Sequence, residues 1–165
     1  MKMAHDAAEI SYAKRKQVGA ILVVPDGCRF EGVNGMPSGF DNCCETEENK
    51  TKQECLHAES NAIAKVARST ASSVGGTLYC TLSPCLECAK LVVQAGIIRV
   101  VYGEQYPYLG HTGEVRALGL DLLREAGIQV DNLDLCSHNV GNEEPNCQDE
   151  GRYYDPYESW RDYRP

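Results

Sequence analysis

The chain has few basic residues for its size. Its 165 residues include 24 acidic and 16 basic side chains, which gives a formal net charge of −8. A surface that binds nucleic acid needs clustered lysine and arginine to meet the phosphates. The acidic balance therefore argues against a nucleic-acid partner and favours a small-molecule substrate.

Long apolar runs are absent as well. No segment approaches the ~20 apolar residues that span a bilayer. The first residues, Met1 to Asp6, lack the apolar stretch of a secretory signal. We therefore expect a cytoplasmic protein with no membrane partner. The chain also has no internal repeat, and its length is that of one domain whose core needs no disulfide.

The number of cysteines is odd. Nine occur in the chain, and an odd number at this length fits reduced thiols better than a disulfide framework. Cys28 and Cys80 lie in strand-like runs, so we expect small core residues there. Cys136 and Cys147 lie in the C-terminal part and are expected to be free thiols.

Three more cysteines precede the first motif described below. Cys43, Cys44 and Cys55 lie in or beside a polar, glycine-bearing loop over residues 34–54. A loop of that length usually has a function. These sulfurs allow a second, structural zinc, but no fourth ligand stands out, so free thiols remain the alternative.

Two short motifs carry the chemistry. His57-Ala58-Glu59 is followed by Pro84-Cys85-Leu86-Glu87-Cys88. Structural zinc usually has four protein ligands, whereas catalytic zinc has three and keeps one position for water or substrate. Here the close ligands are three, His57, Cys85 and Cys88, and Glu59 is a carboxylate suited to moving a proton beside them.

The local pattern supports this spacing. Residues 56–68 favour a helix with an alanine-rich face, which places His57 and Glu59 in its first turn. Pro84 suits the first position of a second helix, with Cys85 and Cys88 at i and i+3 on one face. Both helix N-termini then favour thiolates at the metal.

Each of the two motifs also occurs in proteins outside catalytic zinc sites. A Cys-x-x-Cys pair is found in structural zinc knuckles and in redox sites. A non-catalytic zinc module would use His57, Cys85 and Cys88 as a scaffold, with Cys80 or Cys55 as fourth ligand. The order of the two motifs, with a proline before the first cysteine and helical patterns after each, favours catalysis.

The remaining pattern alternates strands and helices. We therefore predict an α/β fold of three layers, α/β/α, with a mixed central sheet of about five strands and helices on both faces. A turn at residues 25–27 joins the first two strands as a hairpin. The predicted helices are 6–16, 56–68, 84–96 and 114–126, and the predicted strands are 18–24, 28–33, 76–82, 97–102 and 128–130.

The composition changes near the C-terminus. We predict one domain over residues 1–135 and an acidic, aromatic-containing tail over residues 136–165. Disorder is one interpretation of the tail. Its aromatic residues favour the other, attachment to the domain or to a neighbouring subunit. These residues are Tyr153, Tyr154, Tyr157, Trp160 and Tyr163.

The chain resembles the deoxycytidylate (dCMP) deaminases of the cytidine deaminase-like superfamily. The order H-x-E then P-C-x-x-C is typical of zinc nucleobase deaminases as a whole. The Asn-Gly-x-Pro-x-Gly loop at residues 34–39 and the Glu-Cys-Ala-Lys run at residues 87–90 are narrower and point to dCMP. The resemblance covers about residues 10–130, in the stretches 17–20, 34–39, 55–63, 84–90 and 94–97.

The resemblance implies a cytidine deaminase-like fold and an activity. The activity is the hydrolysis of dCMP to dUMP and ammonia, which supplies the precursor of thymidylate. Zinc would be held by His57, Cys85 and Cys88, and Glu59 would carry the protons. Two other interpretations stay open: a zinc deaminase acting on free cytidine or tRNA adenosine, and the non-catalytic zinc module.

The resemblance also implies substrate contacts. Asn34 would bind the sugar hydroxyl, although asparagine before glycine is also common in turns. Backbone groups of Ala58 and Ser83 would contact the base edge. Tyr106 would contact the substrate after the fourth strand, with Tyr108 as the alternative because this segment is longer than usual.

The phosphate partner is left open by the sequence. A monophosphate needs a cation or a helix N-terminus. Lys14, Arg15 and Lys16 are the candidates, and the alternative is that they form a solvated helix end.

The resemblance also implies regulation at the loop of residues 34–39. Many relatives are homohexamers that are activated by dCTP and inhibited by dTTP, bound with Mg²⁺. Asn34, Gly35, Met36 and Gly39 would then be effector residues, although residues 40–42 depart from the expected sequence. Magnesium binding by Glu45, Glu47 and Glu48 is the weaker interpretation of those residues, and an exposed acidic run is the stronger one.

Overall fold

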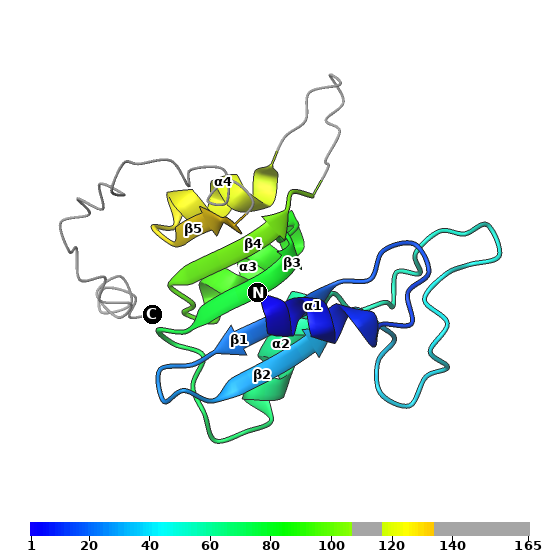
Figure 1. Ribbon diagram of the computed structural model, residues 1–165, viewed down its shortest axis with the longest axis horizontal. Coiled ribbons are helices and arrows are strands. Elements are labelled where there is room, and N and C mark those ends of the chain that lie inside the picture. Colours follow the sequence, from blue (N-terminus) through cyan, green and yellow to red (C-terminus); the bar gives the residue numbers. More distant parts are fainter. Residues whose placement is uncertain (107–116, 134–165) are drawn as a thin grey trace, which may run out of the picture.

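The computed structural model describes residues 1–106 and 117–133. Five strands form one sheet in the order β2-β1-β3-β4-β5. β1 pairs antiparallel with both β2 and β3, whereas β3, β4 and β5 run parallel. This mixed sheet confirms the predicted fold class (Figure 1). The strands are β1 Gly19–Val23, β2 Arg29–Val33, β3 Thr77–Leu82, β4 Arg99–Glu104 and β5 Gln129–Asn132.

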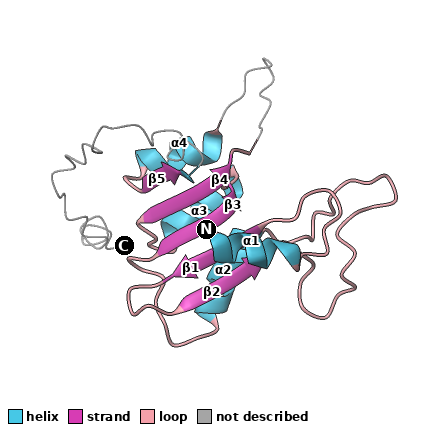
Figure 2. Ribbon diagram, in the orientation of Figure 1, coloured by secondary structure: helices cyan, strands magenta, loops and turns pink. Residues whose placement is uncertain are grey.

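Helices cover both faces of the sheet. They are α1 Lys2–Glu9, α2 Ala58–Ala67, α3 Leu86–Gln94 and α4 Leu118–Glu125. Figure 2 shows α1 in front of β1 and β2, and α3 behind β3 and β4. Because side chains alternate along a strand, Leu22 faces the large core under α2, α3 and α4, while Ile21 faces α1. None of the helices in the described ranges is long and apolar enough to span a membrane.

Two glycines let helices approach the sheet at backbone distance. A Cβ at Gly19 would lie 2.0 Å from the carbonyl oxygen of Ala4 in α1. A Cβ at Gly32 would lie 2.0 Å from the carbonyl oxygen of Ala58 in α2, on the opposite face. Since α2 begins beside His57, the contact at Gly32 fixes the height of the predicted metal site above the sheet.

The predicted first helix was wrong in its position. α1 spans Lys2–Glu9 rather than residues 6–16. Ser11 turns its hydroxyl to the carbonyl oxygen of Asn34 at 2.8 Å, and the backbone N–H groups of Lys14 and Arg15 donate to the Glu45 carboxylate. These long-range acceptors take the place of helical carbonyls, so residues 11–18 connect α1 to β1 as a loop and not as a helix.

Two local predictions need correction as well. Cys28 is exposed, because the turn continues through it and its N–H donates to the Asp26 carboxylate at 2.8 Å. Cys80 is buried, as predicted. Pro84 lies one residue before the N-cap of α3 rather than at its first position, because Cys85 still has extended backbone angles (φ −70°, ψ 171°).

Some predictions fall on residues outside the described ranges. These are the tail at residues 136–165, the thiols Cys136 and Cys147, the first part of the helix predicted at 114–126, and the alternative substrate residue Tyr108.

The glycine contact generates a prediction about stability. Gly32→Ala should lower the free energy of unfolding by about 1–3 kcal/mol, because the new methyl group overlaps the α2 backbone. Urea unfolding followed by circular dichroism measures this change. Gly35→Ala is the matched control, since its Cβ would meet only the Asn42 side chain at 3.5 Å. Equal losses in both variants would contradict the contact as the cause.

Candidate active site

The starts of α2 and α3 meet at three metal-ligating side chains. His57 is the N-cap of α2, and Cys85 is the N-cap of α3. The Nδ1 atom of His57 lies 3.4 Å from the Sγ of Cys85 and 3.3 Å from the Sγ of Cys88. The three donor atoms all lie within 4.8 Å of one another. The structure thus brings the three predicted ligands together.

The donor set and its spacing fit zinc. Zn–N and Zn–S bonds of about 2.0 and 2.3 Å in a tetrahedral centre place the nitrogen and each sulfur about 3.5 Å apart. The observed nitrogen to sulfur distances of 3.3 and 3.4 Å are close to that value. One imidazole and two thiolates are also the mixed donors that zinc binds readily.

No fourth ligand joins the group within the described residues. The Sγ of Cys80 is 3.8 Å from the carbonyl oxygen of Val101, inside the core. The Sγ of Cys55 is 3.7 Å from the carbonyl oxygen of Leu56. The structure therefore does not supply the closed four-ligand centre of the zinc module.

The second cysteine cluster is not a metal group in the described chain. Cys44 and Cys55 are buried together with Ala13, whereas Cys43 is exposed. Burial raises the pKa of the Cys55 thiol to about 11. A buried thiol with a raised pKa suits packing, and within the described residues Cys43, Cys44 and Cys55 form no group that could hold a metal ion.

The three side chains of the ligand group shift one another's pKa values. Hydrogen bonding with Cys88 and His57 lowers the pKa of Cys85 to about 4, whereas the contact with Cys85 raises the pKa of Cys88. The hydrogen bond that the His57 ring donates to the Cys85 sulfur raises the pKa of His57. Protons bound at these side chains compete with a cation, so metal binding by this group is expected to depend on pH.

Glu59 lies in the first turn of α2, two residues after His57, and is only 4% exposed. Burial raises the pKa of its carboxyl group, although the charge of His57 opposes this. A raised pKa brings this carboxyl group closer to the range in which a general acid and base works.

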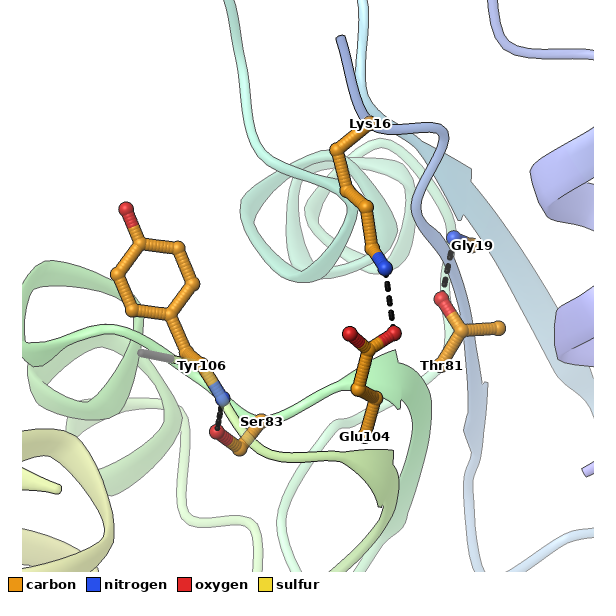
Figure 3. A network of polar contacts seen from close by, with 6 residues as sticks. All are labelled: Lys16, Gly19, Thr81, Ser83, Glu104 and Tyr106. Carbon is orange, nitrogen blue, oxygen red and sulfur yellow. Dashed lines mark hydrogen bonds and ion pairs between the residues drawn. The ribbon is translucent and has the colours of Figure 1, made fainter. Parts of the chain in front are cut away.

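His57, Cys85 and Glu59 line a cavity of about 610 Å³. All four predicted substrate residues line it. Ser83 and Tyr106 are held together, because the N–H of Tyr106 donates to the Ser83 hydroxyl at 2.7 Å (Figure 3). The predicted substrate residues in the wall are Asn34, Ala58, Ser83 and Tyr106.

Asn34 has a structural role in addition to its place in the wall. Its side-chain oxygen accepts hydrogen bonds from the Ser11 hydroxyl at 2.7 Å and from the Val18 N–H at 2.8 Å. Its side-chain amide donates to the carbonyl oxygen of Lys16 at 2.8 Å. Asn34 therefore ties residues 11–18 to the end of β2, and its contact with a sugar stays a prediction.

The other predicted effector residues lie outside this cavity wall. Gly35 pairs with Leu56 through two backbone hydrogen bonds, which joins the loop to the residue before His57. Met36 packs against the buried Cys44 and Cys55 cluster, and Gly39 is exposed with a φ of +92°. Their role in regulation remains a prediction.

Two of the three basic residues that the sequence offered for the phosphate also line the cavity. Arg15 and Lys16 do so, whereas Lys14 does not. Glu45 is buried, at 7% exposed, which corrects the expectation of an exposed acidic run at that position. The sequence carried no local signal for Glu45, because its partners lie 30 and 31 residues away. Further wall residues missed from sequence are Lys50, Thr51 and Glu104.

Comparisons with known proteins agree with this site. The sequence profile of the cytidine and deoxycytidylate deaminase zinc-binding region matches residues 1–104. The deoxycytidylate deaminase of Schizosaccharomyces pombe is 34% identical over 141 residues, which are 79% of this chain and 41% of that protein. The deoxycytidylate deaminase of Enterobacteria phage T4 is 33% identical over 158 aligned residues, covering 71% of this chain and 79% of that protein.

A solved structure is similar over most of its length. It is the dCMP deaminase of cyanophage S-TIM5 in complex with dCMP and dUMP, with 41% identity and a TM-score of 0.71. The match covers 80% of this chain and 92% of that chain. This chain spans only 41% and 42% of the fission and budding yeast relatives. With the profile match over residues 1–104 and the ligand group of His57, Cys85 and Cys88, the chain belongs to the cytidine and deoxycytidylate deaminase family.

Proposed function

We propose that this protein is a zinc-dependent hydrolase that converts dCMP to dUMP and ammonia. The observation that carries the proposal is that the buried Glu59 lines one cavity together with His57 and Cys85 of the three-ligand group. Basic side chains in the same wall favour a phosphorylated substrate. The similarity to a cyanophage enzyme solved with dCMP and dUMP supports this choice of nucleotide. The product would serve as the precursor of thymidylate.

His57, Cys85 and Cys88 would hold the zinc ion. Bound there, zinc supplies a Lewis acid that makes water nucleophilic near neutral pH. Glu59 accepts the proton that water loses and delivers it to N3 of the cytosine ring as water adds at C4. Glu59 then takes the proton of the new C4 hydroxyl group and transfers it to the amino group, so that ammonia leaves as the C4–N bond breaks and the C4 carbonyl forms. The buried position of Glu59 keeps bulk water from competing for these protons.

Four wall residues would orient the nucleotide. The N–H of Ser83 already donates to the carbonyl oxygen of Glu104 at 2.8 Å, so its carbonyl group is the one that would contact the base edge. Ala58 would contribute a backbone group from the start of α2. Asn34 would bind the sugar hydroxyl with the amide hydrogen that its contact with Lys16 leaves over. Tyr106 would pack against the substrate from the segment after β4.

We also propose feedback by nucleotides on a homo-oligomer, with a hexamer as the expected state. The Asn34 to Gly39 loop resembles the loop of enzymes that dCTP activates and dTTP inhibits with Mg²⁺. Its pairing with Leu56 supports this, since a change at the loop would reach His57 through one residue. Ammonia release from dCMP with and without each triphosphate and Mg²⁺ tests the idea, and identical rates would contradict it.

Two alternatives predict different outcomes. A free-nucleoside deaminase would turn over deoxycytidine as well as dCMP, but the basic residues of the wall favour the phosphorylated form. A tRNA adenosine deaminase would need a basic surface, which a net charge of −8 disfavours. A non-catalytic module would turn over none of these substrates.

The role of Glu59 generates the central prediction. Glu59→Gln should lower kcat for dCMP by about 10²- to 10⁴-fold, because the amide cannot accept and return a proton. Zinc content should stay at the wild-type level, since Glu59 is not a ligand. Ammonia release and metal analysis measure the two effects. Glu31→Gln on the exposed surface of β2 is the control, and wild-type turnover by Glu59→Gln would contradict the mechanism.

The metal group generates a second prediction. Cys88→Ser should lose most of its zinc on dialysis and should lose turnover with it, because serine is a poor zinc ligand. Cys28→Ser is the matched control, since Cys28 is exposed and lies outside the ligand group. Atomic absorption gives the metal content of each variant. Full zinc retention by Cys88→Ser would show that the three residues do not form the site.

A further inference from the structure

The segment at residues 11–18 carries charged side chains into the cavity wall without forming a helix. A buried carboxylate holds it in place. The Oε1 atom of Glu45 accepts hydrogen bonds from the backbone N–H of Lys14 at 2.8 Å and of Arg15 at 3.2 Å. Both bonds end on one oxygen, and Glu45 itself is only 7% exposed. The backbone at Arg15 is therefore fixed from the loop that precedes α2.

Three basic residues line the cavity, and their partners differ. Lys16 is paired with Glu104 at the end of β4, as Figure 3 shows. Lys50 is paired with Glu48 at 2.6 Å. The positive charges of both lysines are thus matched by carboxylates, which reduces what they offer to an anionic ligand.

Arg15 is the exception. Within the part of the chain that the structure describes, no carboxylate oxygen lies within 4.0 Å of its guanidinium group. One terminal nitrogen, Nη1, donates to the hydroxyl of Thr51 at 3.2 Å. A guanidinium group has five N–H donors, so this bond orients Arg15 and leaves donors for a ligand. Its planar fork matches two oxygens of a phosphate.

We propose that Arg15 is the specificity-determining residue for the 5′-phosphate of the substrate, and that Glu45 and Thr51 are positioning residues. This inference rests on the proposed function, since it assigns one part of the same cavity to the phosphate. Glu45 fixes the backbone of Arg15 and Thr51 fixes the guanidinium group, so the cation is already in place when the nucleotide enters. Such prior ordering lowers the entropic cost of binding.

Two neighbouring residues allow a matched test. Arg15→Ala should raise KM for dCMP by about 10- to 150-fold with little change in kcat, which corresponds to the loss of a charge-assisted interaction. Lys14→Ala removes the same charge one residue away, but Lys14 does not line the cavity, so its KM should stay at the wild-type value. Inhibition by deoxyuridine, which has no phosphate, should be equal in all three proteins.

A second pair of variants tests the positioning role. Glu45→Gln keeps an oxygen in place of Oε1, so KM for dCMP should stay near the wild-type value. Glu45→Ala removes the acceptor of both N–H groups and should raise KM as Arg15→Ala does, again without changing inhibition by deoxyuridine. A purely structural role would change kcat, KM and deoxyuridine binding together, and that result would overturn the positioning role.

The results of these experiments distinguish a failure of the Arg15 assignment from a failure of the proposed function. No turnover of dCMP by the wild-type protein would overturn the proposed function. Turnover of dCMP with equal KM values for Arg15→Ala and Lys14→Ala would leave that function standing and overturn the assignment of Arg15. Weaker inhibition by deoxyuridine in Arg15→Ala would also overturn it, because the contact would then not be to the phosphate.

Discussion

The contact between the His57 ring and the two cysteine sulfurs is the constraint on which the rest of the structure depends. It requires two helices to begin at one point, although 28 residues separate His57 from Cys85. The parallel pairing of β3 with β4 and the backbone contact of α2 with Gly32 make that meeting possible. Each ligand sits in or beside the first turn of a helix, where free N–H groups favour negative sulfur. The sheet thus acts as a frame that holds two helix ends together.

Two polar side chains, Asn34 and Glu45, hold the loop at residues 11–18 against the sheet and the site. Asn34 and Glu45 carry no catalytic task in the described geometry, yet between them they bond to five residues of the segment at 11–18. A buried carboxylate is costly unless hydrogen bonds satisfy it, and two backbone N–H groups do so for Glu45. The same bonds give the cavity wall a fixed shape. The hydrogen bonds that offset the cost of burying Glu45 are therefore also the bonds that keep the cavity wall in order.

The grouping of His57, Cys85 and Cys88 and the α/β architecture were predictable from sequence because their signals are local. His57 and Glu59 are two residues apart, Cys85 and Cys88 three, and strand and helix periods repeat within short windows. The failures had a different cause. The first helix was placed too late because the bonds from Asn34 and Glu45 join residues that are far apart in the chain. Cys28 was misplaced because a turn residue and a strand residue look alike at an element boundary.

The hydrogen bonds of Glu45 and Asn34 also limit how this part of the chain can be exchanged. The segment at 11–18 is not a separable module, since its backbone conformation is set by residues 34 and 45. Transplanting it into a relative without the loop would move the backbone and leave a buried carboxylate unsatisfied. Segment and loop are therefore expected to vary together among homologues, and a change of nucleotide preference would have to alter both at once.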